Sequence, residues 1–132
     1  MPYVADTRAL VWAVSNQKRR LGVRARKVFA AADQGQALIC LSVITLLELD
    51  WLEAADKLQF KEGFEGLAQR LLASPGYQIV PLTMEMILLS RRFRDLDPMD
   101  RLIVATAEEL DCSLVTADAA IQARHPVPIV WD

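Results

Sequence analysis

The sequence predicts an α/β fold with a central, mostly parallel sheet. Short apolar runs alternate along the chain with amphipathic stretches that are long enough for helices. This alternation is typical of parallel strands whose connecting helices cover both faces of the sheet. The chain has 132 residues, 53% of them hydrophobic, so we expect one domain spanning 1–132 with a substantial core.

The N-terminal half is expected to contain two strands and three helices. In the first helix Leu10, Val11 and Val14 recur at helical spacing. Gly35 is placed to end the second helix, and Ser42 to cap the third. The expected elements are a strand over 3–6, helices over 7–14 and 22–34, a strand over 37–41 and a helix over 43–56.

The C-terminal half repeats the same alternation. The run Ser74-Pro75-Gly76 ends one helix, and Thr83 and Asp97 are good caps for the next two. The expected elements are a helix over 62–73, a strand over 77–81, helices over 84–93 and 98–110, a strand over 113–116, a short helix over 118–123 and an edge strand over 129–131.

Four carboxylates occupy positions that suggest a common site. Asp6 and Asp118 close the first strand and the last clear one, while Glu48 and Asp100 lie on apolar helical stretches. Acids in apolar surroundings are costly to bury unless a positive charge joins them. Ligands of open α/β sheets bind beyond the carboxyl ends of the strands, where Asp6 and Asp118 are expected.

Each acid taken alone also has a structural explanation. Asp6 and Asp118 are suited to cap the helices that follow them. Asp100 is the third residue of a helix that Asp97 caps, where a negative charge favours the positive helix end. This kind of explanation is weakest for Glu48, because the helical face that carries it is otherwise apolar.

Together, the four acids favour a divalent cation. Crowded carboxylates repel one another and raise each other's pKa, and Mg²⁺ or Mn²⁺ would remove that conflict. Such an ion also activates water and stabilises the leaving oxygen of a phosphate ester. The one histidine, His125, is expected at the surface, and the glycines form no phosphate-binding loop. The pattern therefore predicts a metal-dependent hydrolase that acts on a phosphate ester.

The charge distribution is more informative than the formal net charge of −2. Residues 15–32 contain no acid, and a smaller basic group follows over 91–94. Basic patches of this kind can hold a polyphosphate strand, although solvated helical cations are the alternative interpretation. The cations of the first group are Lys18, Arg19, Arg20, Arg24, Arg26 and Lys27.

The remaining features indicate a cytoplasmic protein without a membrane partner. Cys40 and Cys112 form neither a disulfide framework nor a zinc-binding spacing. No apolar run reaches the roughly 18 residues of a membrane span. The N-terminal segment lacks the pattern of a secretory leader.

Several segments together resemble the PIN-domain nucleases, especially the VapC-type toxins of type II toxin–antitoxin systems. The segments are YVADTRALVWAV, SVITLLELDWLEAADKLQF, DPMDRLIVATAEELDCSLVTAD and PIVWD. The resemblance implies a three-layer α/β/α sandwich, a Mg²⁺ or Mn²⁺ site and endonucleolytic RNA cleavage. Its metal-binding and catalytic acids fall on Asp6, Glu48, Asp100 and Asp118.

The resemblance also implies supporting residues and partners. Thr116 matches a hydroxyl residue that supports the fourth acid, and Asp97 matches an acid just outside the metal shell. A cognate antitoxin is expected to lay a segment near the acidic pocket, against a wall formed by Leu47, Trp51 and Leu52. A homodimer is expected as well. The segment over 60–82 matches only in its helical character, so the resemblance implies no particular RNA.

The hypothesis for the site is that Asp6, Glu48 and Asp100 hold one ion, partly through water. Asp118 completes a second, weaker site or orients the attacking water. RNA contacts are expected from Arg19, Arg20 and Arg24, which belong to the first basic group. Arg101 is a further candidate, with pairing to Asp97 as its alternative.

Three other functional classes compete with this hypothesis. A receiver-like signalling domain would need a second early acid and a Lys after the last strand, yet no Lys follows Lys61. A catalytically silent RNA-binding protein and a nuclease for other nucleic acids would share the same fold. The intact set of acids argues against the silent protein.

Overall fold

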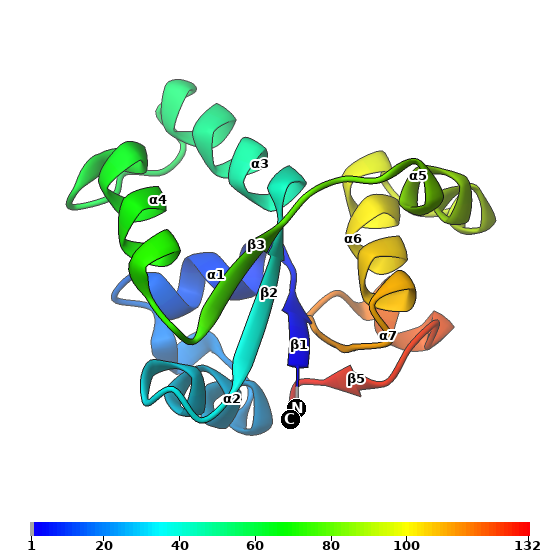
Figure 1. Ribbon diagram of the computed structural model, residues 1–132, viewed down its shortest axis with the longest axis horizontal. Helices are drawn as coiled ribbons and strands as arrows, with labels where there is room; N and C mark the ends of the chain where they lie inside the picture. Colours follow the sequence, from blue (N-terminus) through cyan, green and yellow to red (C-terminus); the bar gives the residue numbers. More distant parts are fainter. Residues whose placement is uncertain (1) are drawn as a thin grey trace.

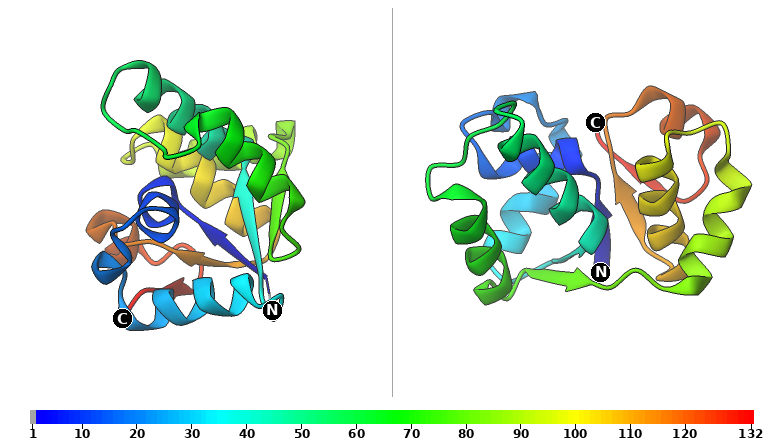
Figure 2. Two further views of the ribbon diagram at one scale, coloured as in Figure 1. Left: turned by 90° about the vertical axis from the view of Figure 1, so that its left-hand side faces the viewer. Right: turned by 90° about the horizontal axis from the view of Figure 1, so that it is seen from above.

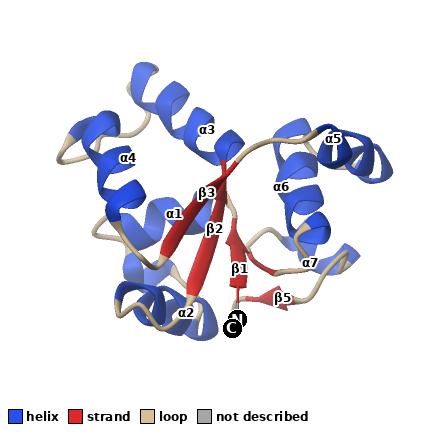
Figure 3. Cartoon of the chain, in the orientation of Figure 1, coloured by secondary structure: helices blue, strands red, loops and turns tan. Residues whose placement is uncertain are grey.

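In the computed structural model, which describes residues 2–132, a five-stranded parallel sheet forms the centre of the protein (Figures 1 and 3). The strand order is β3-β2-β1-β4-β5, and each neighbouring pair is parallel. Met1, part of the expected domain span 1–132, lies outside the described residues. The strands are β1 (Pro2–Ala5), β2 (Leu38–Ser42), β3 (Tyr77–Val80), β4 (Ser113–Val115) and β5 (Ile129–Val130).

The helices connect these strands and cover both faces of the sheet. The α-helices are α1 (Thr7–Val14), α2 (Val23–Asp33), α3 (Val43–Ala54), α4 (Gly63–Ala73), α5 (Met84–Ser90), α6 (Pro98–Glu109) and α7 (Ala119–Arg124). Two short 3₁₀ turns are η1 (Lys18–Arg20) and η2 (Arg91–Phe93). Within residues 2–132, no helix has the length and apolar character needed to cross a bilayer.

The alternating strand residues divide the core into two layers. Ala5, Ile39 and Val115 pack with α1, α2 and α4 on one face of the sheet. Val4 and Leu114 pack with α6 and α7 on the other face. Figure 2 shows these two groups of helices on opposite sides of the strands. The expected three-layer α/β/α sandwich is therefore confirmed, and the sheet is parallel throughout.

The expected elements are all present, with ends that differ by a few residues. The largest difference is in the helix expected over 84–93, where α5 ends at Ser90 and the chain tightens into η2. The turn η1 has no counterpart among the expected elements. It forms inside the basic group, where no hydrophobic periodicity marks a local structure.

Side-chain caps fix where the helices begin after the strands. The hydroxyl of Ser42 accepts a hydrogen bond from the Ile44 amide, and Thr83 accepts one from Met86. Asp6, Asp97 and Asp118 cap α1, α6 and α7 in the same way. Because these carboxylates cap helices that begin near the carboxyl ends of the strands, they are held there by backbone hydrogen bonds.

We expect Gly76 to be required for packing of β3 against α2. A Cβ at Gly76 would lie 2.0 Å from the carbonyl oxygen of Ala32, whereas a Cβ at Gly35 would meet nothing within 4 Å. Gly76→Ala should therefore lower the free energy of unfolding by about 1–3 kcal/mol through overpacking. Gly35→Ala is the control and should cost only the strain of its positive φ, roughly 1 kcal/mol. Urea denaturation would measure both, and equal losses would contradict this account.

Candidate functional site

The candidate site lies where the chain changes direction across the sheet. From the central strand β1, the chain first builds β2 and β3 on one side, and later β4 and β5 on the other. The carboxyl ends of β1 and β4 are therefore neighbours at a topological switch point, where open α/β sheets bind ligands. Asp6 follows β1 directly and Asp118 follows β4 shortly after, so the topology places both acids at this point.

Asp6 is the most buried of the four acids, with only 7% of its surface exposed. Its Oδ1 accepts a hydrogen bond of 2.9 Å from the Ala9 amide in the first turn of α1. Its Oδ2 accepts a hydrogen bond from the hydroxyl of Thr116. Both carboxylate oxygens are therefore oriented by the protein, and the side chain is held in one position.

Thr116 links Asp6 to the start of α7. The side chain is fully buried. Besides donating to Asp6, its Oγ1 accepts a hydrogen bond of 3.0 Å from the Asp118 amide. Asp118 in turn caps α7 by accepting hydrogen bonds from Ala120 and Ile121. One threonine thus couples the positions of two of the acids.

Glu48 reaches the site from the middle of α3. The hydroxyl of Thr7, the first residue of α1, donates a hydrogen bond of 2.6 Å to Glu48 Oε1. This bond joins α1 to α3 and directs the Glu48 carboxylate toward the end of β1. The acid is half-buried, as expected for a residue whose helical face is otherwise apolar.

Asp100 reaches the site from the first turn of α6. Asp97 caps this helix by accepting a hydrogen bond of 3.0 Å from the Met99 amide, and Pro98 occupies the first helical position. Asp100 is therefore held close to the positive end of α6, which favours its negative charge. Asp97 is exposed at the edge of the site.

The four acids all line one cavity of about 360 Å³. It opens between α1, α3 and the first turns of α6 and α7. Its lining consists of Asp6, Thr7, Arg8, Val11, Glu48, Leu52, Lys57, Leu58, Asp100 and Asp118. We call this space the acidic cavity. Asp97 and Thr116 are absent from its lining: Asp97 is exposed at its edge, and Thr116 is buried beside Asp6.

The pKa values show that the acids influence one another. The pKa of Asp100 is raised to about 6, mainly by burial and in addition by the charges of Asp118, Asp97, Asp6 and Glu48. Burial also raises the pKa of Asp6, against the lowering effect of its hydrogen bonds. The carboxylates are thus close enough to repel one another.

The pKa of Glu48 follows the same pattern. Burial raises it, the hydrogen bond from Thr7 lowers it, and the charge of Asp97 raises it. Asp97 therefore acts on both Glu48 and Asp100, although it does not line the acidic cavity.

The donor set suits a hard divalent cation. Over residues 2–132, the ion pairs join Arg70 to Glu62, Arg92 to Glu108 and Arg124 to Asp95. None of them includes one of the four cavity acids. Among these described residues, no three acid, His or Cys side chains converge closely enough to form a complete metal site by themselves. A hard cation that keeps several waters would need only some of the four acids as direct ligands.

The structure places the expected RNA-contact arginines outside the acidic cavity. Arg101 donates hydrogen bonds to the carbonyls of Leu96 and Arg94, at 2.7 and 2.6 Å, so it supports the loop before α6. It forms no ion pair with Asp97 among the described residues, and that alternative is wrong.

The arginines of the first basic group lie beyond the far end of α1. Arg19 and Arg20 belong to η1, and Arg24 lies on α2. The Arg20 guanidinium lies 4.9 Å from the centre of the Trp12 ring. None of the three lines the acidic cavity.

Two cations that the sequence did not single out do line this cavity. Arg8 follows Thr7 in the first turn of α1, and Lys57 lies in the loop after α3. The position of Arg8, two residues after Asp6, could have predicted that it lines the cavity, because the first turn of a helix lies beside its cap. Lys57 carries no comparable signal, since only the path of the loop brings it to the cavity.

Thr116 is expected to hold Asp6 in place. Thr116→Val keeps the side-chain shape but removes the donor to Asp6 and the acceptor for Asp118. The free energy of unfolding should fall by about 1–3 kcal/mol, because buried polar groups lose their partners. Thr116→Ser restores the hydroxyl and should recover most of this loss. Thermal denaturation of both variants would test the role, and equal losses would show that the methyl group, not the hydroxyl, matters.

Repulsion among the acids should make stability depend on pH. The pKa of Asp100 is raised in the folded protein from 3.8 to about 6, so the folded state binds more protons and loses stability as pH rises between these values. In chelator above pH 6, Asp100→Asn should raise stability on the order of 1 kcal/mol, after allowance for solvent screening. Asp50→Asn, an exposed acid on α3, is the control. An unchanged pH profile for Asp100→Asn would contradict the repulsion.

Comparison with known proteins identifies the family of this chain. The family model described as PIN domain matches residues 3–125. Ribonuclease VapC22 of Mycobacterium tuberculosis is 30% identical to this chain, over 96% of the chain and 95% of the relative.

Solved structures share the fold at lower identity. A chain of VapBC2 from Rickettsia felis, bound to a DNA fragment from its promoter, has a TM-score of 0.73 and 19% identity, with 100% of both chains covered. DNA-bound VapBC from Salmonella typhimurium gives a TM-score of 0.67 and 20% identity, over 98% of this chain and 96% of that one. The match of the family model over most of the sequence shows that this chain belongs to the PIN domain family.

Proposed function

We propose that the protein is a Mg²⁺- or Mn²⁺-dependent endoribonuclease and the toxin of a toxin–antitoxin pair. The observation that carries this proposal is the convergence of Asp6, Glu48, Asp100 and Asp118 in one cavity without a salt-bridged cation among the described residues. Similarity to Ribonuclease VapC22 supports the reaction class. The fold neighbours, which are VapBC complexes, support the toxin–antitoxin context.

The acids have different parts in this mechanism. Asp6, Glu48 and Asp100 would hold the ion, partly through water, and Asp118 would complete the site or orient the attacking water. When bound, the ion supplies an activated water and stabilises the oxygen that leaves the phosphate. Thr116 and Thr7 orient Asp6 and Glu48 through their hydrogen bonds. Asp97 raises the pKa of two of the acids from the edge of the cavity.

Arg8 and Lys57 are the cations best placed to bind the substrate near the reacting bond. Both line the acidic cavity, so their charges can attract an RNA phosphate toward the acids. Neither forms a salt bridge within residues 2–132. Arg19, Arg20 and Arg24 remain proposed contacts for more distant parts of the strand, where they would add salt-dependent affinity.

Two apolar surfaces are candidates for binding the partner proteins. Leu52 and Leu58 add apolar area to the acidic cavity, next to the acids that a bound antitoxin segment would cover. On the outer side of α3, Leu47 and Trp51 are 38% and 51% exposed, one helical turn apart. We propose this face for the antitoxin or for a second copy of the chain, in a cytoplasmic protein that forms homodimers.

Cleavage assays with labelled single-stranded RNA and DNA would test the function. Wild-type protein should cut RNA with Mg²⁺ or Mn²⁺ and stop in chelator. Glu48→Gln and Asp100→Asn should each lower the rate at least ~100-fold, because they alter ligands of the ion. Glu53→Gln and Asp50→Asn remove the same charges from α3 outside the cavity and serve as matched controls.

Three outcomes would contradict the proposal. Full activity in Asp100→Asn would show that the Asp100 carboxylate is not needed for cleavage. Cleavage of DNA alone would favour a nuclease for other nucleic acids. RNA binding without cleavage, under all metal conditions, would favour a catalytically silent member of the family.

A further inference from the structure

We propose that a second cavity, at the far end of α1, binds a nucleotide of the RNA strand a short distance from the bond that is cut. This inference rests on the proposed function, because it takes RNA as the strand in the acidic cavity. It adds a subsite that would contribute to the affinity and selection of the substrate.

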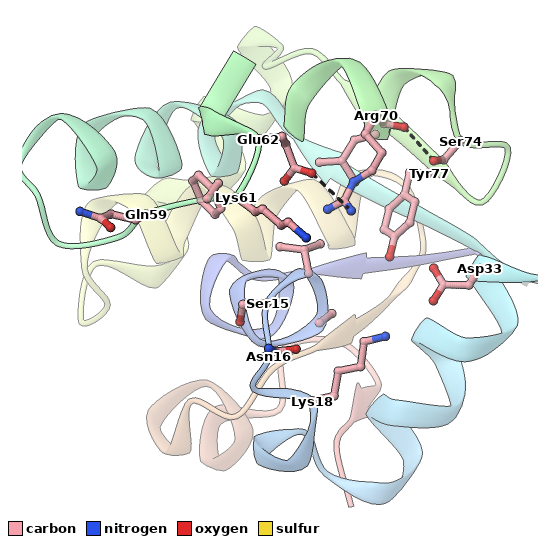
Figure 4. A pocket seen from close by; sticks show the side chains of 14 residues that line it. Ser15, Asn16, Lys18, Asp33, Gln59, Lys61, Glu62, Arg70, Ser74 and Tyr77 are labelled. Carbon is pink, nitrogen blue, oxygen red and sulfur yellow. Dashed lines mark hydrogen bonds and ion pairs between the residues drawn. The ribbon is translucent and has the colours of Figure 1, made fainter. Parts of the chain in front are cut away.

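The second cavity has a volume of about 540 Å³, within the usual range for small-ligand sites. It is lined by the end of α1 with the turn that follows, the end of α2, the loop before α4, α4 itself and the start of β3 (Figure 4). We call it the distal cavity. Its charged lining residues are Lys18, Asp33, Lys61, Glu62 and Arg70, and its aromatic ones are Phe60 and Tyr77.

Two lysines give the distal cavity an affinity for anions. Arg70 is engaged by Glu62 at 3.6 Å, but neither Lys18 nor Lys61 forms a salt bridge within residues 2–132. Both are exposed, and Figure 4 shows their side chains extending toward the same space from opposite sides. Asp33 and Glu62 also line the cavity, but the three cations Lys18, Lys61 and Arg70 outnumber them, and this net positive charge suits a phosphate.

The rest of the lining suits a nucleoside. Asn16 carries an exposed side-chain amide that forms no hydrogen bond within the described chain, so it is free to bind a base or a ribose hydroxyl. Phe60 and Tyr77 add aromatic surface of the kind on which RNA bases stack. Burial and the nearby charge of Asp33 raise the pKa of Tyr77, so its hydroxyl stays protonated and can donate a hydrogen bond.

The two cavities are neighbours along the same pair of chain segments. On α1, Arg8 and Val11 line the acidic cavity, while Ala13 and Val14 line the distal one. In the loop after α3, residues 57–58 line the first and 59–62 the second. Since α1 rises about 1.5 Å per residue, Arg8 and Val14 are ~9 Å apart along its axis. One RNA strand would span that distance with a few nucleotides.

RNA binding in chelator would test the subsite without any need for cleavage. Fluorescence anisotropy with a labelled single-stranded RNA would compare wild type with Lys18→Ala/Lys61→Ala. The control, Lys27→Ala/Arg91→Ala, removes the same net charge from exposed positions outside both cavities. The Lys18→Ala/Lys61→Ala variant should bind RNA at least ~10-fold more weakly than the control variant, which loses only general electrostatic attraction. Equal losses would overturn the proposal.

Titration with adenosine and cytidine 5′-monophosphate, followed by amide NMR in chelator, would locate the site. Shifts over 15–18 and 59–62 that disappear in the Lys18→Ala/Lys61→Ala variant are expected. Shifts confined to the acidic cavity, or an acidic peptide that shifts the same amides while the nucleotides do not, would overturn the proposal.

Cleavage kinetics separate this proposal from the proposed function. The distal variant should lose kcat/KM on a long RNA and keep it on a dinucleotide that is too short to reach the distal cavity. Wild-type protein that binds RNA in the distal cavity but cuts nothing with either metal would refute the nuclease and leave the subsite intact. Active wild-type protein with an unaffected distal variant would refute the subsite alone.

Discussion

The site depends on the buried hydroxyl of Thr116 between two neighbouring strands. This hydroxyl donates to Asp6 at the end of β1 and accepts from the Asp118 amide at the start of α7. The parallel pairing of β1 with β4 creates this contact, because it aligns Ala5 with Val115. Without the hydroxyl, a buried carboxylate oxygen would lose its partner, which costs more than the bond itself contributes.

The acidic cavity holds negative charge at a cost to the stability of the fold. Burial and four neighbouring acids raise the pKa of Asp100 to about 6, so negative charge there is unfavourable in the folded protein without a cation. Helix caps and hydrogen bonds from Thr7 and Thr116 nevertheless hold Asp6 and Glu48 in the cavity. A bound ion would convert this repulsion into affinity, because it joins carboxylates that the fold has already positioned.

The sequence identified the acids because their surroundings are unusual. Acids that end apolar strands or lie on apolar helical faces are recognisable from local patterns, and the caps Ser42, Thr83 and Asp97 mark the starts of helices. Most basic residues carry no such mark, and Arg8, two residues after the cap Asp6, is an exception. Arg101 follows Asp100 in sequence, yet it binds the backbone carbonyls of Leu96 and Arg94.

The sequence by itself determined the alternation of strands and helices, their caps and the choice of the four acids, because these follow from local hydrophobic periodicity and side-chain chemistry. Only the tertiary structure decided that β1 and β4 are neighbours, that Lys57 lines the acidic cavity and that Lys18 and Lys61 both line the distal one. These relations depend on strand order and on the path of loops, which bring together residues far apart in the chain and leave no periodic trace in it.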